Sequence, residues 1–323
     1  MAQPIEYSFS REIRKNENHK TLFFEFIKNN LSEHTQKAYI SDINKFLNFC
    51  TLNKYSLDRR FFNPTTISDF RDYLNLMGQK PSTVKRALTT LKVFYDFLVD
   101  KKKIDFNPVK GVQRPTVKLK VETDELNDEE VNLLFDSFNL SNNNPKILSD
   151  IRDYALVKLM FMTGLRVSEA TSIKVGQFIK IRDRHYLNLL VKGGYFRRIP
   201  VPKNVIEAID DYKKIYIKSK GDIFNKDGFL FINTRAKNNL LSINRSTVNK
   251  LFQKKGMELG FITNNRNFTP HSARATVAGN LYKNNVTLVK AADLLGHADP
   301  RMTLAYIKRR GDYLDEASDA INY

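Results

Sequence analysis

The sequence predicts a mainly α-helical protein with one small β-sheet, in which a helical N-terminal domain precedes a mixed α+β C-terminal domain. Apolar residues recur at helical spacing from about 20 to 100, and helical patterns dominate again from about 204 to the end. Three short runs with β-strand character lie between them, near 177–182, 185–191 and 195–201. A single small sheet inside a helical protein is therefore expected.

The N-terminal pattern predicts four short amphipathic helices between residues 18 and 106. One covers about 66–77, and the last follows Pro81 at its first turn. Because each apolar stripe can bury one face, the helices are expected to form a small bundle. Cys50 belongs to such a stripe, so core packing is expected for it. The other stripes consist of Leu22, Phe23 and Phe26; of Ile40, Ile43, Phe46 and Leu47; and of Val84, Leu88, Leu91, Phe94, Tyr95 and Leu98.

A linker is expected at residues 107–124. It begins at Asn107-Pro108 and consists of isolated basic and apolar residues with Pro115 among them. The acids of Asp128-Glu129-Glu130 then favour a helix start, because the helix dipole stabilises negative charge there. The second domain is therefore expected over 125–323.

Inside the second domain, a helix over about 151–162 is expected to end at Gly164. Gly193-Gly194 is expected to turn the last two strands into a hairpin. One further short apolar run covers 229–232, and helices follow it to the C-terminus.

The composition favours a polyanionic partner. The chain has 323 residues, and 53 Lys and Arg against 35 Asp and Glu give it a formal charge of +18. Nucleic acid is the leading candidate, and a basic protein without a specific partner is the alternative. No run approaches the roughly 18 apolar residues of a membrane span, and the charged start is unlike a secretory signal. One cysteine excludes an intrachain disulfide and clustered-cysteine metal sites. We expect a cytoplasmic protein with no membrane partner.

Two short motifs carry arginines beside possible partners. In Thr163-Gly164-Leu165-Arg166-Val167-Ser168-Glu169-Ala170, Arg166 and Glu169 share a helix face, and an ordinary ion pair at a helix start is the alternative. In Thr269-Pro270-His271-Ser272-Ala273-Arg274, Thr269 is expected to cap a helix that Pro270 begins. His271 and Arg274 then lie one turn apart, and a purely structural pair is the alternative.

The last motif places a histidine and a tyrosine close together in the chain. Leu294-Leu295-Gly296-His297-Ala298-Asp299-Pro300 indicates a helix that ends at glycine, and this turn is expected to expose His297. Tyr306 follows nine residues later, on a helix that could pack back against the same site. Taken alone, Tyr306 would be interpreted as a core side chain.

The order of these motifs resembles the tyrosine recombinase, or phage integrase, family. The resemblance covers roughly residues 20–310. The first domain, with its segments 32–49 and 82–98 and its end at Asn107-Pro108, resembles the SAM-like, helical core-binding domain of the Xer-type members. The resemblance implies a core-binding domain over 18–106 and a catalytic domain over 125–323.

The resemblance also implies seven active-site positions. Tyr306 would be the nucleophile and His271 its proton acceptor. Lys192, on the hairpin, would protonate the departing 5′ oxygen, although Arg197 or Lys203 could be confused with it on spacing alone. Glu169 would orient Arg166 or His271. The full set is Arg166, Glu169, Lys192, His271, Arg274, His297 and Tyr306, and His297 would donate a hydrogen bond to a phosphate oxygen.

Such a set fits phosphoryl transfer without a metal. Two guanidiniums, those of Arg166 and Arg274, can bind the two non-bridging oxygens of a phosphodiester through paired N–H groups. No carboxylate cluster with metal-ligand spacing is present in the sequence. A tyrosyl phosphate ester keeps the energy of the broken bond, so rejoining needs no ATP. We therefore expect no metal and no cofactor.

The expected partner is double-stranded DNA, gripped by phosphate contacts from a basic surface. A solvated polar face is the alternative for these residues, which are Lys80, Lys85, Arg86, Lys92, Lys101, Lys102 and Lys103. Seventeen residues follow Tyr306, and 313–321 are amphipathic. In related recombinases a C-terminal helix docks on the adjacent subunit. The resemblance thus implies a homo-tetramer on DNA, or a hetero-tetramer with a related recombinase.

The implied activity is site-specific recombination through a 3′-phosphotyrosine and a Holliday junction. Because the helices begin near residue 20, an arm-binding domain like that of many phage integrases is not expected. Resolution of DNA dimers or cointegrates fits this compact plan, and integration of a mobile element is the alternative. A type IB topoisomerase and a non-catalytic DNA-binding protein are less favoured interpretations.

Overall fold

The computed structural model describes residues 25–27, 33–55, 63–116, 125–141, 147–190, 196–234 and 241–307. The chain divides into two compact units, Met1–Lys120 and Val121–Tyr323. Each unit has a hydrophobic core of its own. Helices make up most of both, and a three-stranded sheet lies in the second, which confirms the predicted fold class.

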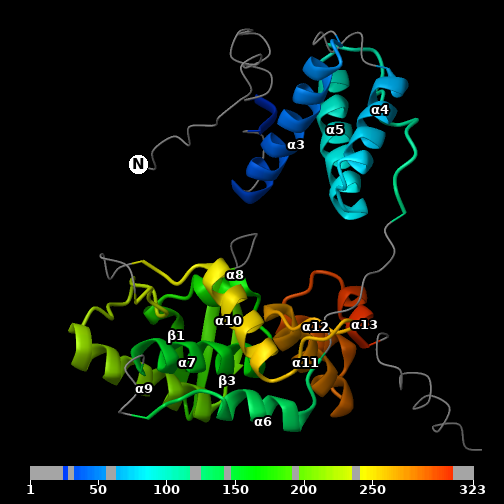
Figure 1. Cartoon of the computed structure of the whole chain (residues 1–323). Helices are drawn as coiled ribbons and strands as arrows, with labels where there is room; N and C mark the ends of the chain where they lie inside the picture. The colour runs from blue at the N-terminus through cyan, green and yellow to red at the C-terminus, as the bar shows by residue number, and fades with distance from the viewer. Residues whose placement is uncertain are drawn as a thin grey trace, which may run out of the picture. The chain divides into compact units, whose positions relative to one another are not determined.

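The first unit is built on three helices that pack side by side, α3 (Glu33–Leu52), α4 (Pro64–Leu76) and α5 (Pro81–Asp100) (Figure 1). Proline occupies the first turn of α4 and of α5, where a missing N–H has no consequence. Cys50 is fully buried, as predicted, and burial raises the pKa of its thiol to about 12. The Leu22 and Phe23 stripe lies outside the described residues, but Phe26 is buried in this core.

The first part of the predicted linker packs onto this helical unit. The Asn107 side-chain amide donates to the Lys92 carbonyl at 2.9 Å and to Asp96 Oδ1 at 2.8 Å. Val109 and Val112 are buried in the same core as α5. Two apolar side chains spaced by a turn can bury in this way without forming a regular helix, so residues 107–112 extend the bundle.

The second unit is built around the buried helix α7, which contacts α9, α11 and the sheet. Its sheet is antiparallel in the order β1-β2-β3, and Leu187 of β2 faces Phe178 on one side and Ile199 on the other. The strands lie where the sequence predicted them. The elements are α6 (Asp128–Asp136), α7 (Ile147–Thr163), α8 (Val167–Thr171), η2 (Val175–Gln177), β1 (Phe178–Ile181), β2 (Arg184–Leu190), β3 (Phe196–Val201), α9 (Lys203–Lys220), α10 (Arg245–Glu258), α11 (Pro270–Lys283), α12 (Leu288–Leu295) and α13 (Pro300–Ile307).

Side-chain capping and two isolated β-bridges complete the second unit. Asn127 caps α6 and forms a capping box with Glu130. The apolar run 229–232 forms two isolated β-bridges, Lys174–Phe229 and Ile232–Ser242, and Leu230 and Phe231 between them are buried. Residues 191–195 lie outside the described part of the chain, and with them the predicted Gly193-Gly194 turn and Lys192. Within the described ranges, no helix combines the length and apolar character that crossing a membrane requires.

Candidate active site

Two glycine breaks bring the site together. Gly164, between α7 and α8, has φ of +65°, and a Cβ added there would lie 2.5 Å from Leu295 Cδ2. Gly296, which ends α12, also has φ of +65°. Only glycine adopts this conformation readily, so the backbone changes direction sharply at each of these two glycines. The turn after α7 therefore packs directly against the end of α12.

Arg166 caps α8 and reaches across to this second turn. Its Nη1 and Nη2 donate to the Gly296 carbonyl at 3.3 and 3.2 Å. Nη1 also donates to Glu169 Oε1 at 3.1 Å, and the Arg166 backbone N–H donates to Glu169 Oε2 at 2.8 Å. The side chain remains 39% exposed. Its guanidinium is thus held in place while one edge stays open to a ligand.

Arg274 on α11 is held more deeply. Its Nη1 donates to the Gly164 carbonyl at 2.7 Å, and Nη2 donates to the Leu295 carbonyl at 2.5 Å. The residue is 2% exposed. Burial, and next the charge of Arg166, lower the pKa of Arg274 to about 10, so it is still protonated at neutral pH. The structure therefore keeps two cations side by side.

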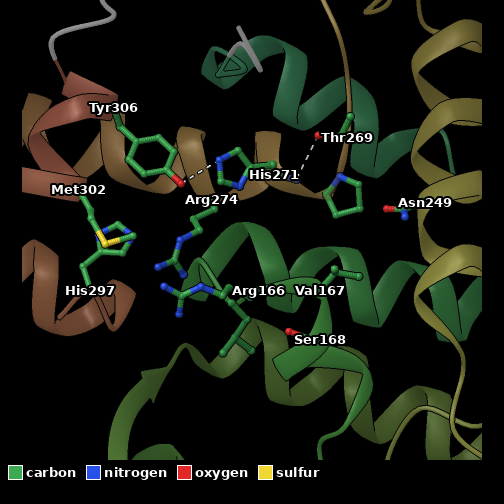
Figure 2. A pocket seen from close by; sticks show the side chains of 12 residues that line it. Arg166, Val167, Ser168, Asn249, Thr269, His271, Arg274, His297, Met302 and Tyr306 are labelled. Carbon is green, nitrogen blue, oxygen red and sulfur yellow. Dashed lines mark hydrogen bonds between the residues drawn. The ribbon is translucent and has the colours of Figure 1, made fainter. Parts of the chain in front are cut away.

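Tyr306 and His271 face each other above these cations (Figure 2). Tyr306 Oη lies 2.9 Å from His271 Nε2. The helix of His271, α11, begins as predicted, because Thr269 caps it and Pro270 occupies its first position. Tyr306 lies on α13, which packs against both α11 and α12. A hydroxyl and a possible proton acceptor are thus in hydrogen-bond contact.

His297 differs from its predicted exposure. It is only 8% exposed, because the turn at Gly296 carries α13 back over the ring. The His297 ring stacks on Tyr306 with centroids 5.8 Å apart, and its Nδ1 lies 2.7 Å from Thr303 Oγ1. Burial, and next the charges of Arg274 and Arg166, lower the pKa of His297 to about 4. The imidazole is therefore neutral at pH 7.

A pocket of about 420 Å³ opens over these side chains. Five predicted site residues line it, namely Arg166, His271, Arg274, His297 and Tyr306. The others lining it are Leu165, Val167, Ser168, Asn249, Thr269, Pro270 and Met302. Glu169 pairs with Arg166 and does not line the pocket. Among the described residues, no group of three or more His, Cys, Asp or Glu side chains could hold a metal ion.

Sequence reasoning missed three contributors. Asn249 of α10 lines the pocket but carries no motif that marks it. Thr303 contacts His297, and only the expectation that α13 folds back could have suggested it. Arg197 of β3 donates to Glu169 Oε2 at 3.2 Å. Strand alternation places Arg197 and the exposed Arg198 on opposite faces, which was the signal available for it.

On the helical unit, the expected DNA-contacting residues lie at the N-cap of α5, on α5 or directly after it, and most of them are exposed. Arg86 Nη2 donates to Asp42 Oδ1 at 2.8 Å, and Asp42 is fully buried. Lys92 is half-buried and pairs with Asp96 at 2.8 Å. Lys101 pairs with Glu25. The exposed members are Lys80, Lys85, Arg86, Lys101, Lys102 and Lys103.

Comparison with known proteins places the chain in a family. The phage integrase family model matches residues 125–311, and the model of the phage integrase N-terminal SAM-like domain matches residues 21–102. Tyrosine recombinase XerC of Leptospira interrogans is 28% identical over 310 residues, covering 94% of this chain and 92% of its own. Tyrosine recombinase XerD of Listeria monocytogenes is 26% identical over 290 residues, covering 88% and 91%.

Solved structures share the fold. XerH bound to palindromic difH in a post-cleavage complex superposes with a TM-score of 0.71 at 18% identity, over 88% of this chain and 79% of that chain. The lambda integrase tetramer bound to a Holliday junction gives a TM-score of 0.65 at 17% identity, over 89% and 75%. With family models matching both units, the chain belongs to the phage integrase family and is a site-specific tyrosine recombinase.

Proposed function

We propose that Tyr306 attacks a DNA backbone phosphate and forms a covalent 3′-phosphotyrosyl link. The observation that carries this proposal is the 2.9 Å contact between Tyr306 Oη and His271 Nε2 above two guanidiniums in one pocket. His271 can accept the phenolic proton as the oxygen attacks, because a general base must lie within hydrogen-bond reach of the proton it removes. Attack then releases a 5′ oxygen from phosphorus.

Arg166 and Arg274 would bind the non-bridging oxygens of the phosphate. These oxygens carry negative charge throughout the transfer, and donors that are already fixed stabilise that charge without reorganising. Both guanidiniums are fixed by backbone carbonyls in the free protein. Neutral His297 would donate one further hydrogen bond, and Lys192 would protonate the departing 5′ oxygen. Lys192 lies outside the described residues, so its role rests on the sequence resemblance.

Reversal of the attack by a 5′ hydroxyl of a partner duplex would exchange strands through a Holliday junction. We place this exchange in a homo-tetramer on duplex DNA in the cytoplasm, or in a hetero-tetramer with a related recombinase. The relatives named tyrosine recombinase XerC and XerD support a simple recombinase. We propose that it resolves DNA dimers or cointegrates, which fits the compact two-domain plan. Residues 308–323 lie outside the described part of the chain. A truncation after Arg310 should impair tetramer assembly, and normal synaptic complexes would contradict that step.

The cleavage chemistry can be tested with a nicked suicide duplex carrying a site recovered by mapping DNA bound in the host. A nick a few nucleotides to the 3′ side of the scissile phosphate lets the short fragment that carries the released 5′ hydroxyl escape, so the covalent protein–DNA adduct accumulates. Wild type should form the adduct in the presence of EDTA, and Tyr306→Phe should form none while still binding the duplex. Tyr282→Phe, on α11 outside the pocket lining, is the matched control and should react normally. An adduct formed by Tyr306→Phe would overturn the proposal.

A plasmid assay separates recombination from the topoisomerase alternative. A supercoiled plasmid with two sites should yield resolved circles if strands pass to a partner duplex. Relaxed circles without recombinants would instead indicate rotation about a single cleaved strand.

A further inference from the structure

Arg197, on strand β3, is a third guanidinium at this site that the proposed chemistry does not use. Its side chain is only 11% exposed, and its Nη2 donates to Glu169 Oε2 at 3.2 Å. The other carboxylate oxygen, Glu169 Oε1, accepts from Arg166 Nη1 at 3.1 Å. One carboxylate therefore joins two guanidiniums, and we call Arg166, Glu169 and Arg197 the ion-pair triad.

Arg197 also lies against the turn that holds Arg166. A Cβ added to Gly296 would lie only 1.5 Å from Arg197 Nη1. The carbonyl of the same glycine accepts from Arg166 Nη1 and Nη2. The two guanidiniums thus flank the Gly296 peptide and share Glu169. Arg197 does not line the pocket, so it acts on a substrate only through its neighbours.

The hydrogen bonding of Arg197 is incomplete. Its Nε and Nη1 are buried, and neither has a hydrogen-bond partner within the part of the chain that the structure describes. Buried donors without partners oppose folding, so a residue that keeps them is poorly suited to a purely stabilising role. The positive charge of Arg197 nevertheless acts on an active-site residue. Burial lowers the pKa of His297 most, and Arg197 is among the cations that lower it further.

We propose that Arg197 is a positioning residue, which offsets the charge of Glu169 so that Arg166 keeps its positive charge for the phosphate. Glu169 alone would form a neutral pair with Arg166 and draw its guanidinium away from the pocket. With Arg197 present, two cations share one carboxylate, and the triad has a formal charge of +1. The inference rests on the proposed role of Arg166 in binding the phosphate.

If the proposal is correct, substitution of Glu169 should restore the cleavage rate that is lost when Arg197 is substituted. Arg197→Met removes the charge but keeps much of the apolar stem, so the triad becomes neutral. Single-turnover cleavage of the nicked duplex at saturating protein should slow by about 10- to 100-fold, the range of coupling within one charge network. Adding Glu169→Gln leaves Arg166 as the only charge and restores +1. In the Glu169→Gln background, Arg197→Met should therefore cost less than about threefold.

Two further variants separate charge from folding. Arg197→Lys keeps the charge and should recover most of the rate. Arg198→Ala removes the same charge from the exposed face of the same strand and should leave the saturated rate unchanged. Thermal unfolding of Arg197→Met should occur at or above the wild-type midpoint, because its unpaired buried donors are gone.

The outcomes are distinguishable. Additive losses in Arg197→Met and Glu169→Gln, or a lowered unfolding midpoint that accounts for the slow cleavage, would overturn the positioning role. A normal rate for Arg197→Met together with a slow Arg166→Ala would overturn this inference alone. A normal rate for Arg166→Ala would overturn the proposed function beneath it.

Discussion

The phenolic oxygen of Tyr306 lies 2.9 Å from His271 Nε2, although 35 residues separate the two in the chain. The contact exists because α12 ends in a left-handed glycine and α13 returns over α11. A histidine in direct contact with a hydroxyl can accept its proton, and removal of this acceptor has consequences that can be measured.

His271→Ala should slow adduct formation on the nicked duplex by about 10²- to 10⁴-fold, the usual contribution of a general base. The remaining rate should rise with pH, because solvent must then accept the phenolic proton. The rate is best measured in single turnover between pH 6 and 9. His185→Ala, on β2 outside the pocket lining, serves as the control. A pH-independent residual rate would argue against His271 as the proton acceptor.

His297 should make the fold less stable in mild acid. Its pKa is lowered from 6.5 to about 4 in the folded protein. Below pH 6.5 the unfolded chain therefore binds a proton that the folded chain does not, and the stability contributed by the neutral ring is lost as pH falls from 6.5 towards 4. The slope from this group is at most about 1.4 kcal/mol per pH unit.

Urea unfolding at several pH values tests this linkage. His297→Gln does not titrate, so its free energy of unfolding should fall less steeply than that of the wild type between pH 6.5 and 4. Other groups contribute equally to both proteins, and the difference isolates His297. Parallel curves would show that the imidazole is not shielded as the structure indicates.

Substitution of Arg166 and of Arg274 should affect cleavage alike but the stability of the fold differently. Arg274→Ala leaves the Gly164 and Leu295 carbonyls without their buried donors, at about 1–3 kcal/mol for each unsatisfied group. Arg166 is 39% exposed, so water can replace it in Arg166→Ala at little cost in stability. Both variants should lose cleavage, but only Arg274→Ala should show a clearly lowered denaturant midpoint. Equal midpoints would contradict the buried role of Arg274.

Much of this site could be predicted from the sequence because local signals fix its helix ends. Gly164 and Gly296 mark chain reversals, and Pro270 marks a helix start, so Arg166, His271 and Tyr306 fall on elements whose positions are set locally. The strands were found for the same reason, since alternation and Gly193-Gly194 define them. That the separate motifs form one active site came instead from the family resemblance.

What the sequence could not provide depends on tertiary contacts. His297 was expected to be exposed, because a turn is usually open, and only the return of α13 buries it. Strand alternation could place Arg197 on the inner face of β3, but it could not identify the partner of Arg197, because the pairing with Glu169 joins positions 28 residues apart. Likewise, two isolated apolar residues carry no periodicity, so the sequence does not show that Val109 and Val112 join the core of the helical unit.

The exposed basic face of α5 should carry part of the DNA affinity. Lys85→Ala should weaken duplex binding for any sequence and reduce the slope of log K against log salt by about 0.9 for each phosphate that the variant no longer neutralises. Asp42→Asn should weaken binding through Arg86, because Asp42 fixes that guanidinium at 2.8 Å. Fluorescence anisotropy between 50 and 300 mM salt, a range chosen so that phosphate contacts dominate, gives the slopes. Lys214→Ala on α9 is the control, and an equal effect there would contradict a specific surface.

Gly164 should be irreplaceable for two separable reasons. Alanine at φ of +65° costs about 1–2 kcal/mol in any setting. At Gly164 the added Cβ would also lie 2.5 Å from Leu295 Cδ2 and 3.3 Å from Val277 Cγ1, and such overpacking adds about 1–3 kcal/mol. Gly260 has φ of +73° with no heavy atom within 4 Å of an added Cβ, so Gly260→Ala measures the backbone cost alone. Urea unfolding should therefore show a larger loss for Gly164→Ala. Cleavage should fall only in that variant, because displacing the Gly164 carbonyl releases Arg274 from the position in which it meets the phosphate.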